Sequence, residues 1–375
     1  MTSDTKEPQA QGQTPGKELA IIETQNNQRC NMREIRLALV GFGNVGQAFA
    51  RLLMEKQQEL ETKYGITPVV TGIMTGRHAS CINPAGIDLK QALSLINQGR
   101  PLTELDTFRF TGDTLEFIQA CPTDVMFETT PVNPISGQPA LNHIRHALEH
   151  GMHVVTANKG PVVYGYHELT ELAARQRLGF RFESAVMDGA PIFSLFRHPL
   201  RGARLLGFSG ILNSCTNLLL DRMGQGETLE EAIAYGASIG ITETDPSNDV
   251  DGWDASIKVA ALSTVLMDHP LTPVEVDREG IRGITREMIA EAEASGERWK
   301  LVCKAYWQDG DFVARVRPER VGPGSPLYSV GGTSSFVNFE LDVLPGLGVL
   351  ESNPSPKTTA FGMLADLIDL EGEQA

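Results

Sequence analysis

One stretch of the chain places many carboxylates in front of a single lysine. Residues 243–258 read Glu-Thr-Asp-Pro-Ser-Asn-Asp-Val-Asp-Gly-Trp-Asp-Ala-Ser-Ile-Lys, and their carboxylates are Glu243, Asp245, Asp249, Asp251 and Asp254. A lysine that is partly desolvated or held near another cation has a lowered pKa and can donate or accept a proton. We expect the rest of the chain to hold this stretch against a cofactor.

The same stretch predicts a loop followed by a helix. Pro246 and Gly252 indicate a turn-rich loop, and apolar residues recur at helical spacing from Trp253 onward. Asp249 or Asp251 is expected to cap this helix by accepting a hydrogen bond from a free backbone N–H.

Asp254 and Lys258 lie four residues apart, so they share one face of the predicted helix. The alternative interpretation is an ordinary capped helix with a surface ion pair, which contributes roughly 0–1 kcal/mol. The remainder of the chain decides between the two.

A glycine-rich turn between a strand and a helix predicts a dinucleotide-binding site. Residues 35–40 form an apolar strand, an amphipathic helix follows, and the turn between them comprises Gly41, Phe42, Gly43, Asn44, Val45 and Gly46. Gly41 allows the tight turn, Gly43 lets the backbone approach a pyrophosphate, and Gly46 lets the helix pack on the strand. The N–H groups at the helix start then bind the phosphates. The alternative is a glycine-rich turn without a cofactor.

The next predicted strand, residues 68–75, bears on the choice between NAD and NADP. NAD-specific sites usually carry Asp or Glu at the end of this strand. Here the end reads Thr75-Gly76-Arg77 and has no carboxylate. Arg77 is expected to pair with a 2′-phosphate, which favours NADP; the alternative is a solvated loop arginine.

Two further strands place polar residues at the same edge of the predicted sheet. Residues 124–131 form a strand that runs into a loop, so Thr129 and Thr130 lie at its carboxyl end, where ligands bind in such folds. Residues 153–156 form the next strand, and Lys159 follows it. Most loop lysines are solvated, so the position of Lys159 alone does not indicate a catalytic role.

The alternation of strands and helices changes at about residue 190. Before that point we expect helices over 139–150 and 166–178, and a strand over 179–186 that carries Glu183. Beyond it we expect strands near 205–212, 299–308, 312–317 and 336–344, a helix from the capping box at Thr228 to about Ala237, and a last apolar helix opened by Thr358.

These elements predict an α/β chain with a Rossmann-type dinucleotide-binding domain and a second, α+β catalytic and dimerisation domain with a mixed or antiparallel sheet. We expect a disordered tail over residues 1–33, because it is polar and lacks hydrophobic periodicity. The binding domain is expected over 34–165, with residues 355–372 returning to it, and the catalytic domain over 166–354.

Composition narrows the class of protein. The chain has 375 residues and a net charge of −15, from 32 basic and 47 acidic residues. This acidity argues against nucleic acid or an anionic membrane surface as a partner. No apolar run reaches the roughly 20 residues that span a bilayer, and the tail lacks the pattern of a secretory signal.

The five cysteines predict reduced thiols in a cytoplasmic protein. They are Cys30, Cys81, Cys121, Cys215 and Cys303, which lie far apart and form no CxxC motif, so a zinc cluster is not expected. Each is read as a core thiol, although catalytic cysteine chemistry stays open on this ground alone.

The chain resembles homoserine dehydrogenases over roughly residues 35–370. The family signature Glu-x-Asp-Pro-x-x-Asp-(Val/Leu)-x-Gly-x-Asp-x-x-x-Lys is complete over 243–258. The family's Asn-Lys element is present at 158–159, and its Glu-x-x-Val and small-residue-Pro-Ile segment at 183–192. At 375 residues the chain resembles the short form of the family, which is without an ACT domain or a fused aspartate kinase.

Three segments depart from the family pattern. Met187-Asp188-Gly189 replaces small residues, the segment usually rich in Gly and Thr is Ile211-Leu-Asn-Ser-Cys-Thr-Asn217, and Ser352-Asn-Pro-Ser-Pro-Lys357 replaces a late Gly-Ala-Gly loop. The last change lies where family members contact the cofactor, so it bears on cofactor preference.

The resemblance implies NAD(P)-dependent interconversion of L-homoserine and L-aspartate 4-semialdehyde, a step in threonine, methionine and isoleucine biosynthesis. The nicotinamide carries the hydride and the protein supplies orientation and charge. By resemblance Glu243, Asp249 and Asp254 bind the substrate. Lys258 and Lys159 are the acid/base and oxygen-polarising groups, assisted by Asp254, and the sequence leaves open which lysine moves the proton.

The resemblance also implies a monovalent cation, such as sodium, held through Glu183 and the carbonyls of Val186, Asp188 and Ala190, and it implies a homodimer. Three alternatives remain. They are another NAD(P)-dependent dehydrogenase of a small amino or hydroxy acid, a cofactor-binding regulatory or structural protein without activity, and an aldehyde dehydrogenase that forms a thioester through Cys215.

Overall fold

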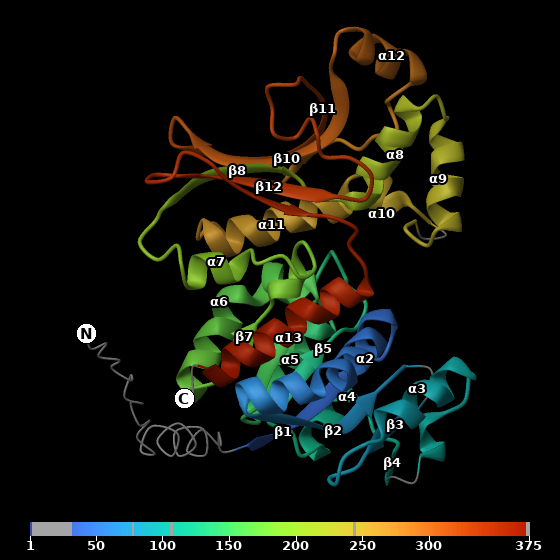
Figure 1. Ribbon diagram of the computed structural model, residues 1–375, viewed down its shortest axis with the longest axis vertical. Helices are drawn as coiled ribbons and strands as arrows, with labels where there is room; N and C mark the ends of the chain where they lie inside the picture. The colour runs from blue at the N-terminus through green and yellow to red at the C-terminus, as the bar shows by residue number, and fades with distance from the viewer. Residues whose placement is uncertain (2–31, 77–78, 106–107, 243–244, 373–375) are drawn as a thin grey trace.

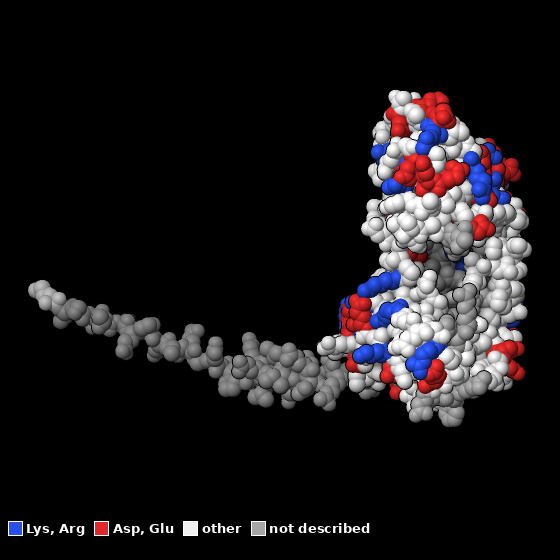
Figure 2. Space-filling model, turned by 90° about the vertical axis from the view of Figure 1, so that its right-hand side faces the viewer, with Lys and Arg blue, Asp and Glu red and all other residues white. Residues whose placement is uncertain are grey.

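The chain folds into two lobes, each built on one β-sheet (Figure 1). The computed structural model describes residues 1, 32–76, 79–105, 108–242 and 245–372. The predicted tail therefore lies almost wholly outside the described residues. Seen from the side, the surface is hollowed between the lobes, and side chains of both charges are interspersed over each lobe (Figure 2). No helix of the described part is long and apolar enough to cross a bilayer.

The first sheet has seven strands in the order β4-β3-β2-β1-β5-β6-β7. Its central strands β2, β1, β5, β6 and β7 run parallel, and the edge strands β3 and β4 pair antiparallel. The strands are β1 Arg33–Val40, β2 Ile66–Met74, β3 Ser80–Ile82, β4 Phe108–Phe110, β5 Val125–Glu128, β6 His153–Thr156 and β7 Phe180–Arg181.

Helices cover both faces of this sheet. Alternate residues of β1 enter opposite cores: Ala38 and Val40 pack on one face, Leu37 and Leu39 on the other. A strand buried on both sides reads as a continuous apolar run, which is why β1 is recognisable in the sequence. The helices of this lobe are α2 Asn44–Glu59, which continues into the short π-helix η1 Leu60–Tyr64, α3 Leu89–Asn97, the 3₁₀ turn η2 Leu102–Glu104, α4 Thr114–Ala120, α5 Ala140–Glu149 and α6 Lys159–Gln176.

Helix α6 begins seven residues earlier than the predicted 166–178. The side chain of Asn158 caps it by accepting the N–H of Gly160 at 3.0 Å. Gly160 and Pro161 suggest a loop in the sequence, but proline is tolerated in a first helical turn because its missing N–H has no partner there anyway. The predicted domain boundary at 165/166 falls inside this helix, and β7 of the first sheet follows it.

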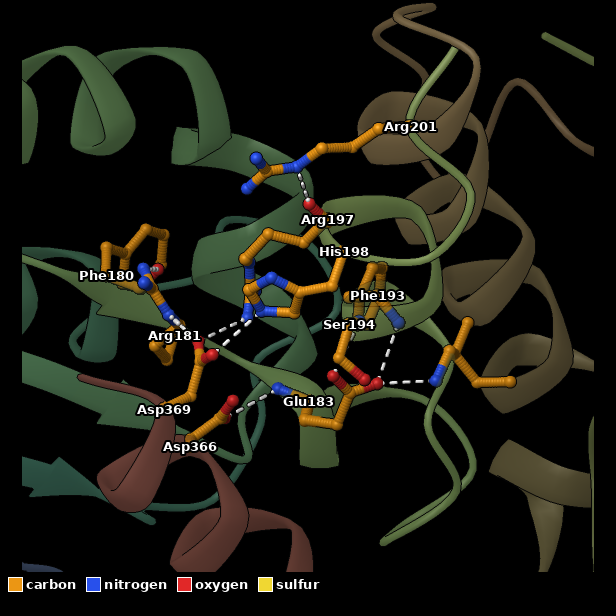
Figure 3. Close-up of polar contacts among 11 residues, drawn as sticks. Phe180, Arg181, Glu183, Phe193, Ser194, Arg197, His198, Arg201, Asp366 and Asp369 are labelled. Carbon is orange, nitrogen blue, oxygen red and sulfur yellow. Dashed lines mark hydrogen bonds and ion pairs between the residues drawn. The ribbon is translucent and has the colours of Figure 1, made fainter. Parts of the chain in front are cut away.

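The predicted strand 179–186 is wrong beyond its first residues. Only Phe180–Arg181 pairs with the sheet, and Glu183–Ala185 forms a 3₁₀ turn, η3. The Glu183 carboxylate accepts the N–H groups of Ile192, Phe193 and Ser194 at 2.5–2.8 Å (Figure 3). These bonds draw the chain out of the sheet and cap the short helix α7 Phe193–Arg197.

The second sheet has six strands in the order β13-β12-β8-β10-β11-β9 and is antiparallel except for the parallel pair β9–β11. The predicted fold class, a Rossmann-type domain with an α+β domain that has a mixed sheet, is confirmed. The strands are β8 Leu205–Ile211, β9 Asp277–Arg278, β10 Arg298–Gln308, β11 Asp311–Val321, β12 Ser335–Leu341 and β13 Leu347–Glu351, and the helices are α8 Ser214–Gly224, α9 Leu229–Ser238, α10 Ser247–Val250, α11 Trp253–Leu266 and α12 Arg286–Ala294.

The last helix, α13 Pro356–Gly372, returns to the first lobe and lies along α2 (Figure 1). Ala360, Met363, Leu364 and Leu367 of α13 are buried in the core beneath α2. The two ends of the described chain therefore build one core.

Candidate active site

The glycine-rich turn has the geometry of a phosphate-binding loop. Gly41 has a φ of +103°, and a Cβ on it would lie 2.7 Å from the backbone carbon of Thr129. A Cβ on Gly46 would lie 2.4 Å from the carbonyl oxygen of Gly41, whereas a Cβ on Gly43 would meet nothing within 4 Å. Gly41 and Gly46 thus permit close packing, and Gly43 faces open space in which a ligand can approach the backbone.

The start of α2 is left free for an anion. No side chain caps its first N–H groups, and its first turn contains no acidic residue. Phe42 is buried in the core, Asn44 is exposed and Val45 is half-buried. The side chain of Phe42 therefore belongs to the core, and the predicted cofactor contact at this position is one of its backbone.

A cleft of about 540 Å³ opens beside this helix start, between α2 and the beginning of α13. Asn44 and Arg51 line it from α2, and Ser355 and Lys357 line it from the segment that replaces the family's Gly-Ala-Gly loop. Lys357 is paired with Glu55 at 2.8 Å. This departure from the family pattern thus brings a lysine to the rim of the predicted cofactor site.

The carboxyl ends of β5 and β6 form a hydrogen-bonded polar edge. Glu128 is fully buried, accepts the Thr130 N–H at 2.9 Å and the Thr156 hydroxyl at 3.0 Å, and also accepts the Thr130 hydroxyl. Asn158 donates to the Thr130 carbonyl at 3.1 Å. Burial raises the pKa of Glu128 to about 7. The loop that holds Thr129 and Thr130 is thereby fixed beside the turn of Lys159.

The structure brings three of the predicted catalytic residues together across the lobes. Asp254 in α11 contacts Lys258 at 2.9 Å and Lys159 at 3.4 Å. Lys159 comes from the first turn of α6, so one carboxylate joins the two lobes. All three side chains are 16–21% exposed, so each keeps some contact with solvent.

Two neighbouring residues that sequence reasoning missed complete this cluster. The carbonyl of Leu212 accepts the Lys258 ammonium at 2.7 Å. The side chain of Asn213 donates to Asp249 at 2.6 Å and to Asp254 at 2.9 Å. The sequence contains a signal for Asn213. It directly follows the predicted strand 205–212, and an asparagine at that point is a candidate helix cap at the edge of the sheet.

The surroundings of Asp254 and Lys258 set the resting charge of each. Burial alone would raise the pKa of Asp254, but Lys258 and Lys159 outweigh it and hold that pKa well below its ordinary value. Burial alone would lower the pKa of Lys258, but Asp254 raises it above the ordinary value. Burial and then the charge of Asp254 raise the pKa of Asp249. The resting site therefore holds an ammonium on Lys258 beside an ionised Asp254.

Two predicted site residues, Glu243 and Arg77, lie outside the described residues. The predicted cap of α11 is wrong. Its N-cap is Gly252, with a φ of +80° and no capping side chain. Asp249 belongs to α10 and bonds Asn213, while Asp251 pairs with Arg282.

Cys215 does not fit a catalytic nucleophile. It is 4% exposed, and burial followed by the charge of Asp249 raises the pKa of its thiol to about 12. A thiol must ionise to attack a carbonyl. The thioester-forming alternative loses its only named residue.

The predicted cation ligand Glu183 is already occupied. Its two carboxylate oxygens accept three backbone N–H groups, which is the arrangement of a helix cap and the opposite of a cation site. Met187 and Asp188 both have positive φ, and the Ala190 carbonyl accepts the N–H of Ile192. The residues do not fit a cation held through the Glu183 side chain. Among the described residues, no group of three or more His, Cys, Asp or Glu is placed to hold a metal.

The first lobe is Rossmann-type and has an open phosphate loop. Its Lys159 meets Asp254 and Lys258 of the second lobe. Together these features define the class of NAD(P)-dependent dehydrogenases. Two family models match the chain, "Homoserine dehydrogenase, NAD binding domain" over residues 41–183 and "Homoserine dehydrogenase" over residues 191–368.

Known proteins of similar sequence and structure agree. The NAD(+)-dependent homoserine dehydrogenase of Pseudomonas canavaninivorans is 34% identical over 90% of this chain and 97% of its own length. The homoserine dehydrogenase of Methanocaldococcus jannaschii is 33% identical over 89% of this chain and 98% of its own length. A hyperthermophilic archaeal homoserine dehydrogenase in complex with NADPH has a TM-score of 0.78 and 27% identity, over 91% of this chain and 98% of that chain.

The chain belongs to the homoserine dehydrogenase family. Its activity is the NAD(P)-dependent interconversion of L-homoserine and L-aspartate 4-semialdehyde, an oxidoreduction at a CH–OH group.

Proposed function

We propose that Lys258 donates the proton that completes the reduction of L-aspartate 4-semialdehyde. NAD(P)H, when bound, supplies the hydride to the aldehyde carbon. The aldehyde oxygen takes a proton from the Lys258 ammonium, which becomes a neutral amine and regains its proton from solvent. Oxidation of L-homoserine is the reverse, with the amine accepting the hydroxyl proton. The ion pair of Lys258 with Asp254 at 2.9 Å is the observation that carries this proposal.

Lys159 is proposed to polarise the reacting oxygen, since it approaches the same carboxylate from the other lobe at 3.4 Å. Two ammonium groups on one carboxylate place two hydrogen-bond donors on one side of the site. A fixed positive charge at the oxygen stabilises the negative charge that develops in the transition state. Lys159→Ala is expected to lower kcat but to keep the pH dependence of proton transfer. Lys258→Ala is expected to lower kcat and to abolish that pH dependence.

Glu243, Asp249 and Asp254 are proposed to bind the substrate. An α-ammonium group taken out of water needs carboxylates around it. Asp249 and Asp254 lie together through Asn213, and Glu243 belongs to the same sequence stretch. The expected result is that Asp249→Asn raises KM for L-homoserine far more than KM for the cofactor, as initial-rate kinetics will show.

The cofactor preference is proposed to be NADP. Strand β2 leads to a turn without a carboxylate, and Arg77 follows it. Arg77→Ala is expected to raise KM for NADP much more than KM for NAD, whereas equal changes would mean that Arg77 does not bind the 2′-phosphate. The family also includes NAD(+)-dependent members by name, so both cofactors belong in the assay.

Three further expectations remain proposals. A homodimer is testable by light scattering of the purified protein, and a cytoplasmic location by fractionation of expressing cells. The third is a monovalent cation held by backbone carbonyls of residues 186–190 without the Glu183 side chain, and sodium titration of activity tests it. Substrate profiling separates L-homoserine from related small amino and hydroxy acids.

A further inference from the structure

Asn213 occupies the corner between β8 and α8, and its side-chain amide has a fixed orientation. Its oxygen accepts the backbone N–H of Thr216 at 2.7 Å and the Thr216 hydroxyl at 2.8 Å. A backbone N–H only donates, so the atom facing it must be the amide oxygen, and the NH₂ group must point the other way. The residue is 3% exposed, so water does not compete for these bonds.

The NH₂ group of Asn213 bridges two carboxylates on different helices. It donates to Oδ1 of Asp249, in α10, at 2.6 Å and to Oδ2 of Asp254, in α11, at 2.9 Å. An amide nitrogen has two hydrogens, one for each carboxylate. Both hydrogens of the Asn213 amide are thus used by the two carboxylates.

Two like charges this close repel one another, and burial strengthens the repulsion. Asp249 also faces Lys258 in α11 and Cys215 in α8, while Asp254 faces Lys258 and Lys159. Both lysines pair with Asp254. Asp249 is left with the weak thiol donor of Cys215 and the amide of Asn213, and the amide is the stronger donor. Without that donor, a proton on Asp249 becomes the simplest bridge between the carboxylates.

We propose that Asn213 is a positioning residue that keeps Asp249 and Asp254 ionised side by side, so that both are available to a substrate ammonium. The preceding residue acts on the same site, because the Leu212 carbonyl orients the Lys258 ammonium at 2.7 Å. The corner between β8 and α8 therefore fixes the acid/base lysine and the carboxylate pair at once. This inference rests on the proposed substrate-binding role of Asp249 and Asp254.

The test uses Asn213→Ser, because serine also caps helices and α8 should keep its N-terminus. Loss of a hydrogen bond to a charged group corresponds to roughly a 10- to 100-fold fall in kcat/KM for L-homoserine. Most of this fall is expected in KM, with cofactor affinity unchanged within about twofold. The acidic limb of the kcat/KM profile should move to higher pH, since Asp249 then holds its proton longer. A purely structural role would not move that limb.

A double-mutant cycle with Asp249→Asn isolates the coupling. An asparagine at 249 removes one charge and can itself donate to Asp254, so adding Asn213→Ser should cost less than about threefold. If the two effects instead multiply in full, or if Asn213→Ser leaves kcat/KM and its pH profile unchanged, the proposal is wrong.

Two controls complete the design. Asn213→Asp keeps the cap and adds a third negative charge, so it should lose more activity than Asn213→Ser; equal or greater activity would contradict the proposal. Thr285→Ser changes the N-cap of α12 away from the site and should leave the kinetics unchanged. A wild-type enzyme inactive on L-homoserine would overturn the proposed function itself, a result distinct from an active wild type with an unaffected variant.

Discussion

At the scale of single residues, Asp254 controls the protonation of the site. It contacts Lys258 at 2.9 Å and Lys159 at 3.4 Å, and its charge keeps the proton on Lys258. A protonated lysine can donate but cannot accept. With Lys258 as the proposed acid/base group, the resting enzyme is prepared for reduction of the aldehyde, and oxidation requires prior loss of a proton.

This resting state gives the two directions different pH profiles. Because the pKa of Lys258 is raised, its amine form is scarce at neutral pH. We expect kcat for L-homoserine oxidation to rise with pH between about 7 and about 10, by up to tenfold per unit, while kcat for reduction shows no such rise. Initial rates in both directions measure this, and a flat oxidation profile would exclude Lys258 as the base.

Glu128 is a second residue with a measurable pH signature. Its pKa is raised from 4.5 to about 7, so between these values the folded state holds a proton that the unfolded state has lost. The free energy of unfolding then decreases as pH rises through this window, by an amount on the order of 2 kcal/mol. Urea unfolding at about pH 5 and about pH 8 should show a smaller decrease for Glu128→Gln. Parallel profiles would contradict this assignment.

At the scale of elements, Glu183 builds the start of α7. Its carboxylate accepts the backbone N–H groups of Ile192, Phe193 and Ser194 at the start of this helix. Glu183→Ala is expected to lower the free energy of unfolding by about 2–4 kcal/mol, with or without sodium. The matched control is Glu231→Ala, which removes an exposed capping-box carboxylate and should cost less than about 1 kcal/mol. Destabilisation seen only in sodium would favour the cation-ligand role instead.

Elements with a local signal were predictable. The strand at 35–40, the glycine-rich turn and the capping box at Thr228 depend on neighbours in the sequence, and each appears where expected. The strand expected through Glu183 failed because its geometry is set by N–H groups about ten residues later and by Asp366, which accepts the Glu183 N–H from α13. Alternating hydrophobicity contains no record of such long-range bonds.

The catalytic site shows the same division. Lys159, Asp254 and Lys258 were predictable as residues because their types and spacing are unusual. Their convergence depends on the packing of α6 against α11. Asn213 was missed because its role needs two partners more than 30 residues away in the chain.

At the scale of the whole molecule, α13 ties the connection between the lobes to the first sheet. Asp369 accepts Arg181 of β7 at 2.7 Å, Arg197 of α7 at 3.0 Å and His198 at 2.8 Å (Figure 3). The side chain of Arg181 is only 9% exposed. The segment leading into the second lobe is therefore held by the end of the chain.

Removal of this carboxylate should destabilise the molecule. Asp369→Ala removes the carboxylate that Arg181, Arg197 and His198 share, so we expect a loss of about 2–4 kcal/mol in the free energy of unfolding. Glu55→Gln, which breaks the exposed pair between α2 and Lys357, is the control and should change stability little. If urea unfolding gives Asp369→Ala the same free energy of unfolding as Glu55→Gln, apolar packing alone holds α13.

Absorbance at the NAD(P)H band shows whether this chain oxidises L-homoserine with a nicotinamide cofactor through Lys258. Purified protein is mixed with L-homoserine and either NADP or NAD, with Lys258→Ala in parallel. We expect the band to grow with wild type and the rate to be at least about a hundredfold lower in the variant, with cofactor affinity little changed. Near-equal rates would contradict the role of Lys258, and no signal from a folded wild type that still binds cofactor would contradict the substrate.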